Sequence, residues 1–233
     1  MTDDRLYIEY IYRGGTDSEL SEQHRKAIES TERYEYVGAG ILSTQYVGDV
    51  TIEPYIDVHD RWSFVHGGSL SHTTPDGEQW DLTDCPLIAY RFDENRFLIG
   101  GDTHPWSDNE HEPLEAVIDL VKLGYTATGD RPVVVYAETP DMPHIGHPPC
   151  TARSLADWRL THLCWLTIFT PNLVDTYGRE TLLSAPAWHV EELEDGAILL
   201  VCHDDPTWET SLQPVADHIG LPTPEDVYRN KRR

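Results

Sequence analysis

Three side chains that can bind a transition metal follow one another at a regular spacing late in the chain. His144, His147 and Cys150 stand three residues apart, within a stretch that carries four prolines between positions 140 and 149. Imidazole and thiolate groups are good zinc ligands. The sequence specifies no fourth ligand, and an extended proline-rich backbone would separate the two imidazoles. We therefore expect no cofactor, with zinc on these three residues as the alternative.

A second group has the residue types of a nucleophile, a base and a carboxylate. Cys202, His203 and Asp204 follow an apolar run, but neighbours on a strand point to opposite faces, and catalytic Cys–His pairs usually come from separate elements. The chain has no nucleophile-elbow, phosphate-loop or zinc-protease motif. These observations favour binding over catalysis. The alternative is a small metal-dependent enzyme, hydrolase-like, using His144, His147 and His203.

If the protein binds a partner, tryptophans are the natural anchors, because buried aromatic side chains dominate many protein interfaces. Trp106 lies in a polar, loop-like stretch, and Trp188 begins an apolar run near the end of the chain. Both are candidate binding residues.

The order of elements predicts an α+β fold. Short β-type runs separated by turn residues fill most of the first half, after a strand at 6–12 and an amphipathic helix at 18–33. A further helix should begin near Pro113 and end with Gly124 as its cap. The clearest hairpin joins 188–193 to 197–202 through an Asp-Gly turn.

These elements predict one domain over residues 1–233, built mainly from an antiparallel sheet with a few packing helices. Residues 138–150 form a possible loop boundary because of their prolines. Residues 221–233 are expected to form a flexible tail that ends in the basic cluster 229–233.

The charge is strongly negative, with 17 basic against 41 acidic residues and a formal net charge of −24. Lysine is rare compared with arginine. At molar salt the Debye length is about 3 Å, so a dense carboxylate surface stays hydrated without strong self-repulsion. The composition resembles that of proteins from salt-accumulating archaea. An ordinary acidic mesophile protein is the alternative, whereas an acidic nucleic-acid mimic is disfavoured because the carboxylates are scattered along the chain.

The same composition bounds location and partners. A protein that neutralises phosphates needs clustered lysine and arginine, so direct nucleic-acid binding is not expected. No apolar run approaches the roughly 20 residues of a membrane-spanning helix, which predicts a cytoplasmic protein without membrane contact. The four cysteines are far apart in the sequence, and we expect free thiols.

One late segment is distinctive as an ordered whole. An aromatic-rich strand begins at Trp165, Pro171 starts a short helix, Gly178 interrupts it, a Leu-Leu pair follows at 182–183, and a hairpin ends at Val201. This segment resembles the late part of immunity-protein families associated with polymorphic toxins and type VI secretion effectors. The resemblance implies a protein partner, a toxin that is bound and neutralised without chemistry. A purely structural or assembly subunit is a further alternative.

Overall fold

The computed structural model describes residues 6–31, 34–36, 49–52, 56–63, 72–73, 79–80, 87–92, 112–138, 148–204 and 210–229. The strands in these ranges are β1 (Leu6–Ile11), β2 (Tyr34–Tyr36), β3 (Asp49–Ile52), β4 (Ile56–Ser63), β5 (His72–Thr73), β6 (Gln79–Trp80), β7 (Leu87–Phe92), β8 (Val134–Glu138), β9 (Leu166–Phe169), β10 (His189–Glu192) and β11 (Ile198–Val201). The helices are α1 (Asp17–Glu29), α2 (Glu112–Thr126), α3 (Ala152–Ala156), α4 (Pro171–Tyr177), α5 (Arg179–Leu183), α6 (Gln213–Ile219) and α7 (Pro224–Arg229).

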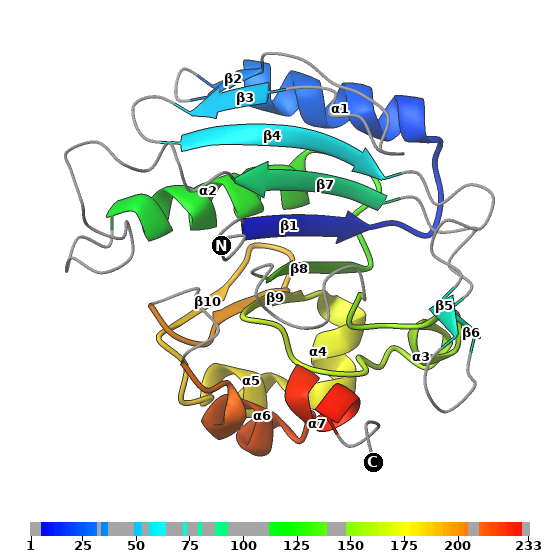
Figure 1. The fold of residues 1–233 in the computed structure, drawn as a ribbon, viewed down its shortest axis with the longest axis vertical. Helices are drawn as coiled ribbons and strands as arrows, with labels where there is room; N and C mark the ends of the chain where they lie inside the picture. The colour runs from blue at the N-terminus through cyan, green and yellow to red at the C-terminus, as the bar shows by residue number, and fades with distance from the viewer. Residues whose placement is uncertain are drawn as a thin grey trace.

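Among the described residues, nine strands form one antiparallel sheet in the order β10-β11-β9-β8-β1-β7-β4-β3-β2, and β5 and β6 pair separately. In Figure 1, α2 passes behind β7, while α4 to α7 gather below β9. The fold is therefore α+β, a mainly antiparallel sheet with packing helices in a single domain, and this confirms the predicted fold class.

The first strand lies at the centre of this sheet. It pairs with β7 on one side and β8 on the other, in registers that place Ile8 opposite Tyr90 and Ala137. Ile8 and Tyr10 are fully buried. This segment is rich in β-forming residues and its apolar side chains are buried. A strand from the beginning of the chain can therefore lie in the middle of the sheet and pair with strands from both halves of the sequence.

One detail of α2 differs from the sequence prediction. The helix does not end at Gly124 but continues to Thr126. A Cβ atom on Gly124 would lie 2.3 Å from the hydroxyl of Tyr10, and this hydroxyl lies 3.4 Å from the carbonyl oxygens of Leu120 and Val121. The glycine is thus a site of close helix–sheet packing rather than a helix cap.

The late segment forms the elements that the sequence predicts. Trp165, Ile168 and Phe169 are buried in and beside β9. Pro171 occupies the first turn of α4, and Gly178 ends that helix with a φ of 89°, which favours glycine. The predicted hairpin is present as β10 and β11, paired from His189↔Val201 to Glu192↔Ile198.

Parts of the predicted loop and tail are described. Pro148, Pro149 and Cys150 are buried, while residues 139–147 lie outside the described ranges. Within the segment expected as a tail, α7 covers Pro224–Arg229, and Leu221 and Thr223 before it are buried. Within the described ranges, no helix combines the length and the apolar character that crossing a bilayer requires.

Candidate functional site

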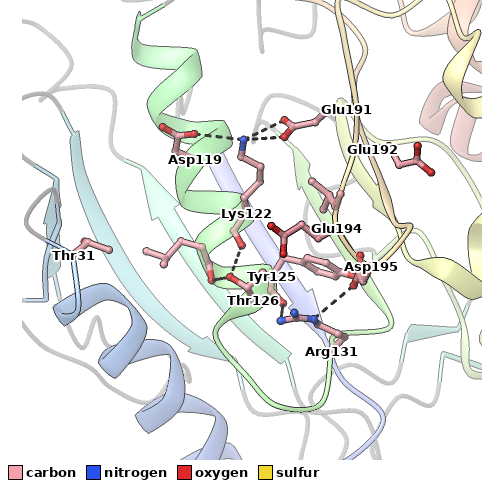
Figure 2. Close-up of a pocket in the computed structure, with 12 residues that line it drawn as sticks. Thr31, Asp119, Lys122, Tyr125, Thr126, Arg131, Glu191, Glu192, Glu194 and Asp195 are labelled. Atoms are coloured by element: carbon pink, nitrogen blue, oxygen red, sulfur yellow. Dashed lines mark hydrogen bonds and ion pairs between the residues drawn. The ribbon is translucent and has the colours of Figure 1, made fainter.

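An open groove lies where α2 meets the tip of the β10–β11 hairpin. Its volume is about 820 Å³. Residues from α2, from the hairpin, from the loop before β8 and from the end of α1 surround it, as Figure 2 shows. The lining residues are Thr31, Asp119, Lys122, Leu123, Tyr125, Thr126, Arg131, Glu191, Glu192, Leu193, Glu194 and Asp195.

Helical periodicity places one wall of the groove. Asp119, Lys122, Leu123 and Thr126 stand at positions i, i+3, i+4 and i+7 of α2, so they share one face of the helix. The neighbouring residues Leu120 and Val121 point to the core and are fully buried. The same helix therefore packs on the sheet with one side and lines the groove with the other.

Lys122 connects the two walls of the groove. Its Nζ lies 3.1 and 3.2 Å from the carboxylate oxygens of Glu191 on β10 and 3.6 Å from Asp119 on its own helix. Glu191 also lies 3.3 Å from Nε2 of His189. Burial opposes ionisation of Glu191, but its bonds with Lys122 and His189 outweigh burial and hold its pKa below the usual range.

The hairpin turn forms the other end of the groove. Gly196 donates its backbone N–H to the carbonyl of Leu193 at 2.9 Å and has a φ of 84°. This geometry is typical of a tight hairpin connection with glycine at the left-handed position. Asp195 stabilises the turn by accepting the backbone N–H of Ala197 at 3.1 Å. The carboxylate of Asp195 is thereby held at the groove mouth.

Tyr125 and Arg131 bring this carboxylate to the end of α2. The Tyr125 hydroxyl donates to Oδ2 of Asp195 at 2.7 Å, and Nε of Arg131 lies 3.6 Å from the same atom. Arg131 also donates to the carbonyl oxygen of Tyr125. Burial, and then the Asp195 carboxylate, raise the pKa of the Tyr125 phenol. The hydroxyl therefore remains a protonated hydrogen-bond donor at physiological pH.

Glu192 borders the groove from the opposite face of β10. Arg179 on α5 donates to both of its carboxylate oxygens, at 2.7 and 2.5 Å. This bidentate contact lowers the pKa of Glu192. Both glutamates of the strand are thus ionised at neutral pH.

The groove is negative overall. Five of its lining residues are carboxylates and two, Lys122 and Arg131, are cations. Leucine and tyrosine side chains add apolar surface. Such a lining can attract and hold a cationic, partly apolar group.

The structure describes only part of the metal site predicted from the sequence. His144 and His147, like the binding candidate Trp106, lie outside the described ranges. Cys150 is fully buried. Within the described ranges, no three side chains of histidine, cysteine, aspartate or glutamate are arranged to hold a metal ion.

The candidate group of Cys202, His203 and Asp204 begins in the core. Cys202 is buried, and its Sγ donates to the carbonyl of Cys164 at 3.5 Å. Burial raises the pKa of this thiol, which disfavours the nucleophilic thiolate. The carbonyl of His203 accepts the indole N–H of Trp165 at 2.9 Å. Trp188 is half-buried, packs against the core and lies beside His189, outside the lining of the groove.

A surface serine–histidine pair joins α5 to α6. Oγ of Ser184 lies 3.2 Å from Nε2 of His218. The same nitrogen lies 3.1 Å from the carbonyl oxygen of Thr181, which can only accept, and the serine hydroxyl donates to the carbonyl of Glu180 at 2.7 Å. Nε2 must therefore carry its proton, so it cannot take one from the serine. The pair holds two helices together.

Sequence reasoning did not identify the groove, although it predicted both walls. Lys122, one of the few lysines, and the Asp195-Gly196 turn were visible signals. The path of the sheet brings these elements together. Lys122 contacts Glu191, which follows it by 69 positions, and Tyr125 contacts Asp195, which follows it by 70 positions. No protein-family model, curated protein or solved structure matches this chain.

Proposed function

We propose that this protein is a non-enzymatic intracellular binding protein, of the immunity type, which holds a basic protein partner such as a toxin in the groove between α2 and the β10–β11 hairpin. The observation that carries the proposal is the lining of that groove, where carboxylates outnumber cations and leucine and tyrosine side chains add apolar surface. A partner that presents lysine or arginine beside apolar side chains complements both features.

The charged groups of the groove are arranged for holding rather than for proton transfer. The ionised carboxylates of Glu191 and Glu192 are engaged by cations from α2 and α5. The phenol of Tyr125 keeps its proton, whereas a general base needs a pKa near the working pH. These features favour recognition of a partner's charge.

The solvent determines how the partner would be held. In the molar salt that the composition suggests, attraction between exposed charges is short-ranged. The apolar surface of Leu123 and Leu193 would then contribute most of the affinity, and the carboxylates would select the partner and its orientation. The protein should therefore bind its partner at high salt.

The test is capture of the partner from a native lysate in molar potassium chloride by the tagged full chain. Glu194 lines the groove and is exposed, so Glu194→Lys should greatly reduce recovery by placing a like charge before the basic partner. Asp175 is exposed on α4, and Asp175→Lys makes the same charge change outside the groove. This control should retain the partner.

Function is tested by co-expression with toxins encoded beside the gene. The unmodified chain and Asp175→Lys should protect cells, and Glu194→Lys should not. If no partner is captured and no toxin is neutralised, or if both variants behave like the unmodified chain, the proposal is wrong.

A further inference from the structure

The groove lies beside β10, the strand at one end of the sheet. β10 is the last strand in the sheet order, and within the described residues it pairs with β11 only. Glu191 and Glu192 are consecutive, so their side chains leave the strand on opposite faces. Glu191 accordingly reaches α2 and Glu192 reaches α5. Both residues are among those that line the groove, so the groove lies against β10 itself.

An exposed strand edge offers backbone donors and acceptors to another strand. Charged side chains are a common means of keeping such edges from pairing with copies of the same protein. Here the charges on and beside the edge are mostly carboxylates, in a chain whose net charge is −24. They oppose a second acidic copy but favour an extended segment with basic side chains. Charge thus decides which occupant the edge accepts.

The ammonium of Lys122 already occupies the position that such a segment needs. It contacts both carboxylate oxygens of Glu191 from the opposite wall. Arginine binds a carboxylate through a planar pair of N–H donors, whereas an ammonium acts as a point charge. The Lys122 side chain is about one-third exposed, so solvent can take over its charge when it leaves. Lys122 is therefore a replaceable internal ligand.

We propose that the partner of the groove contributes an extended, arginine-bearing segment, which pairs with the outer edge of β10 and displaces Lys122 from Glu191. This inference rests on the proposed function and names the partner chemistry at the same groove. It assigns opposite roles to the two members of one ion pair. Glu191 attracts the segment, and Lys122 competes with it.

The experiment compares Lys122→Met with Glu191→Gln in the full chain. Both variants break the same ion pair and keep similar side-chain volume, so a purely structural role would shift binding in the same direction. The probe is a fluorescein-labelled octapeptide of alternating arginine and valine, measured by fluorescence anisotropy at 0.1 M potassium chloride. Near-UV circular dichroism establishes that each variant is folded under these conditions.

We expect Lys122→Met to tighten binding of the octapeptide about two- to five-fold and Glu191→Gln to weaken it by a similar factor, as for an exposed ion pair. An octapeptide N-methylated at alternate residues keeps its charges but loses backbone donors. Its affinity should fall about ten-fold, the effect of losing two or three backbone hydrogen bonds. An octapeptide of alternating glutamate and valine should not bind.

Three results would overturn the inference: equal shifts for the two variants, equal binding of the N-methylated peptide, or no binding of the arginine peptide. If the capture experiment still finds a partner that Glu194→Lys loses, only this mode of binding is wrong. If capture and rescue fail as well, the proposed function is wrong with it.

Discussion

The two sides of α2 serve different purposes although they share one backbone. On the side that faces the sheet, Leu120 and Val121 are fully buried. On the other side, Leu123 is half-buried and Lys122 forms an ion pair with Glu191 of β10. The first side is close-packed, where every atom affects stability. The second side lines the groove, whose volume is about 820 Å³.

The hairpin repeats this division between adjacent strands. All residues of β11 are buried, whereas those of β10 are half-buried or exposed. β11 completes the core between β9 and the edge, and β10 presents charge at that edge. The comparison teaches that the packed core and the proposed binding surface occupy neighbouring residues, so mutations one position apart should separate their effects on stability and on binding.

The largest expected effect comes from replacing a leucine by alanine on each side of α2 in turn. Leu120→Ala should cost about 2–5 kcal/mol of the free energy of unfolding, because it leaves a cavity in the core. Leu123→Ala should cost under about 1 kcal/mol, since that side chain is partly solvated already. Urea unfolding followed by circular dichroism measures both values, and equal costs would contradict the division of α2 into two sides.

In partner binding, the two variants should rank in the opposite order, with Leu123→Ala showing the larger effect. It removes apolar surface from the groove and should weaken capture of the partner. Leu120→Ala should leave capture intact under conditions where the variant remains folded.

Acid should destabilise the core before it breaks the ion pairs of the groove, because α1 buries a histidine. His24 is fully buried, its Nε2 lies 2.6 Å from the Tyr12 hydroxyl, and burial lowers its pKa to about 3. In the unfolded chain His24 takes up a proton near pH 6.5, whereas in the folded chain it stays neutral at this pH. The stabilisation is therefore present above pH 6.5 and is lost as the pH falls, by roughly 2–3 kcal/mol at pH 4.5.

Urea unfolding between pH 7 and pH 4.5 measures this loss. His24→Gln should be less stable at pH 7 but should show a flatter pH dependence over this window. The carboxylates with lowered pKa, Glu191 and Glu192 among them, begin to lose their contribution only near their unfolded pKa at the lower end of this window, and they lose most of it at still lower pH. An unchanged slope in His24→Gln would show that other groups titrate here.

Gly124 tests how closely the packed side of α2 approaches the sheet. Gly124→Ala would place a methyl group 2.3 Å from the Tyr10 hydroxyl, and Tyr10 is fully buried. We expect a loss of about 1–3 kcal/mol, as for other overpacked cores, despite the better helix propensity of alanine. Gly129→Ala is the control, since a Cβ there meets nothing within 4 Å. It should change stability little.

Local pattern predicted much of this fold because the relevant elements carry their own signals. Pro171 and Gly178 delimit α4, and the Asp195-Gly196 turn fixes the hairpin. Gly124 was misread as a cap because a glycine near a helix end and a glycine under a tyrosine ring look alike in sequence. Only the packing of β1 against α2, which brings the Tyr10 hydroxyl to the helix backbone, distinguishes them.

The groove could not be predicted from pattern, for a different physical reason. Glu191 has the charge of any solvated strand residue, and Lys122 fits any exposed helix face. Their contact is produced by the antiparallel sheet, which places the late hairpin at one edge and α2 within reach of it. A groove whose residues come from distant parts of the chain leaves no local signal in the sequence.

The smallest expected effect joins the two sides of the comparison at Tyr125, whose ring is buried but whose hydroxyl reaches Asp195 in the groove. Tyr125→Phe should cost about 1 kcal/mol at pH 7, the value of one hydrogen bond. Because the folded pKa of Tyr125 is raised, its contribution should disappear as the pH rises above about 10, where the unfolded phenol ionises. The difference between the two proteins should therefore narrow in alkali. Asp195→Asn closes a double-mutant cycle, and a coupling near zero would show that this bond does not fix the hairpin tip to α2.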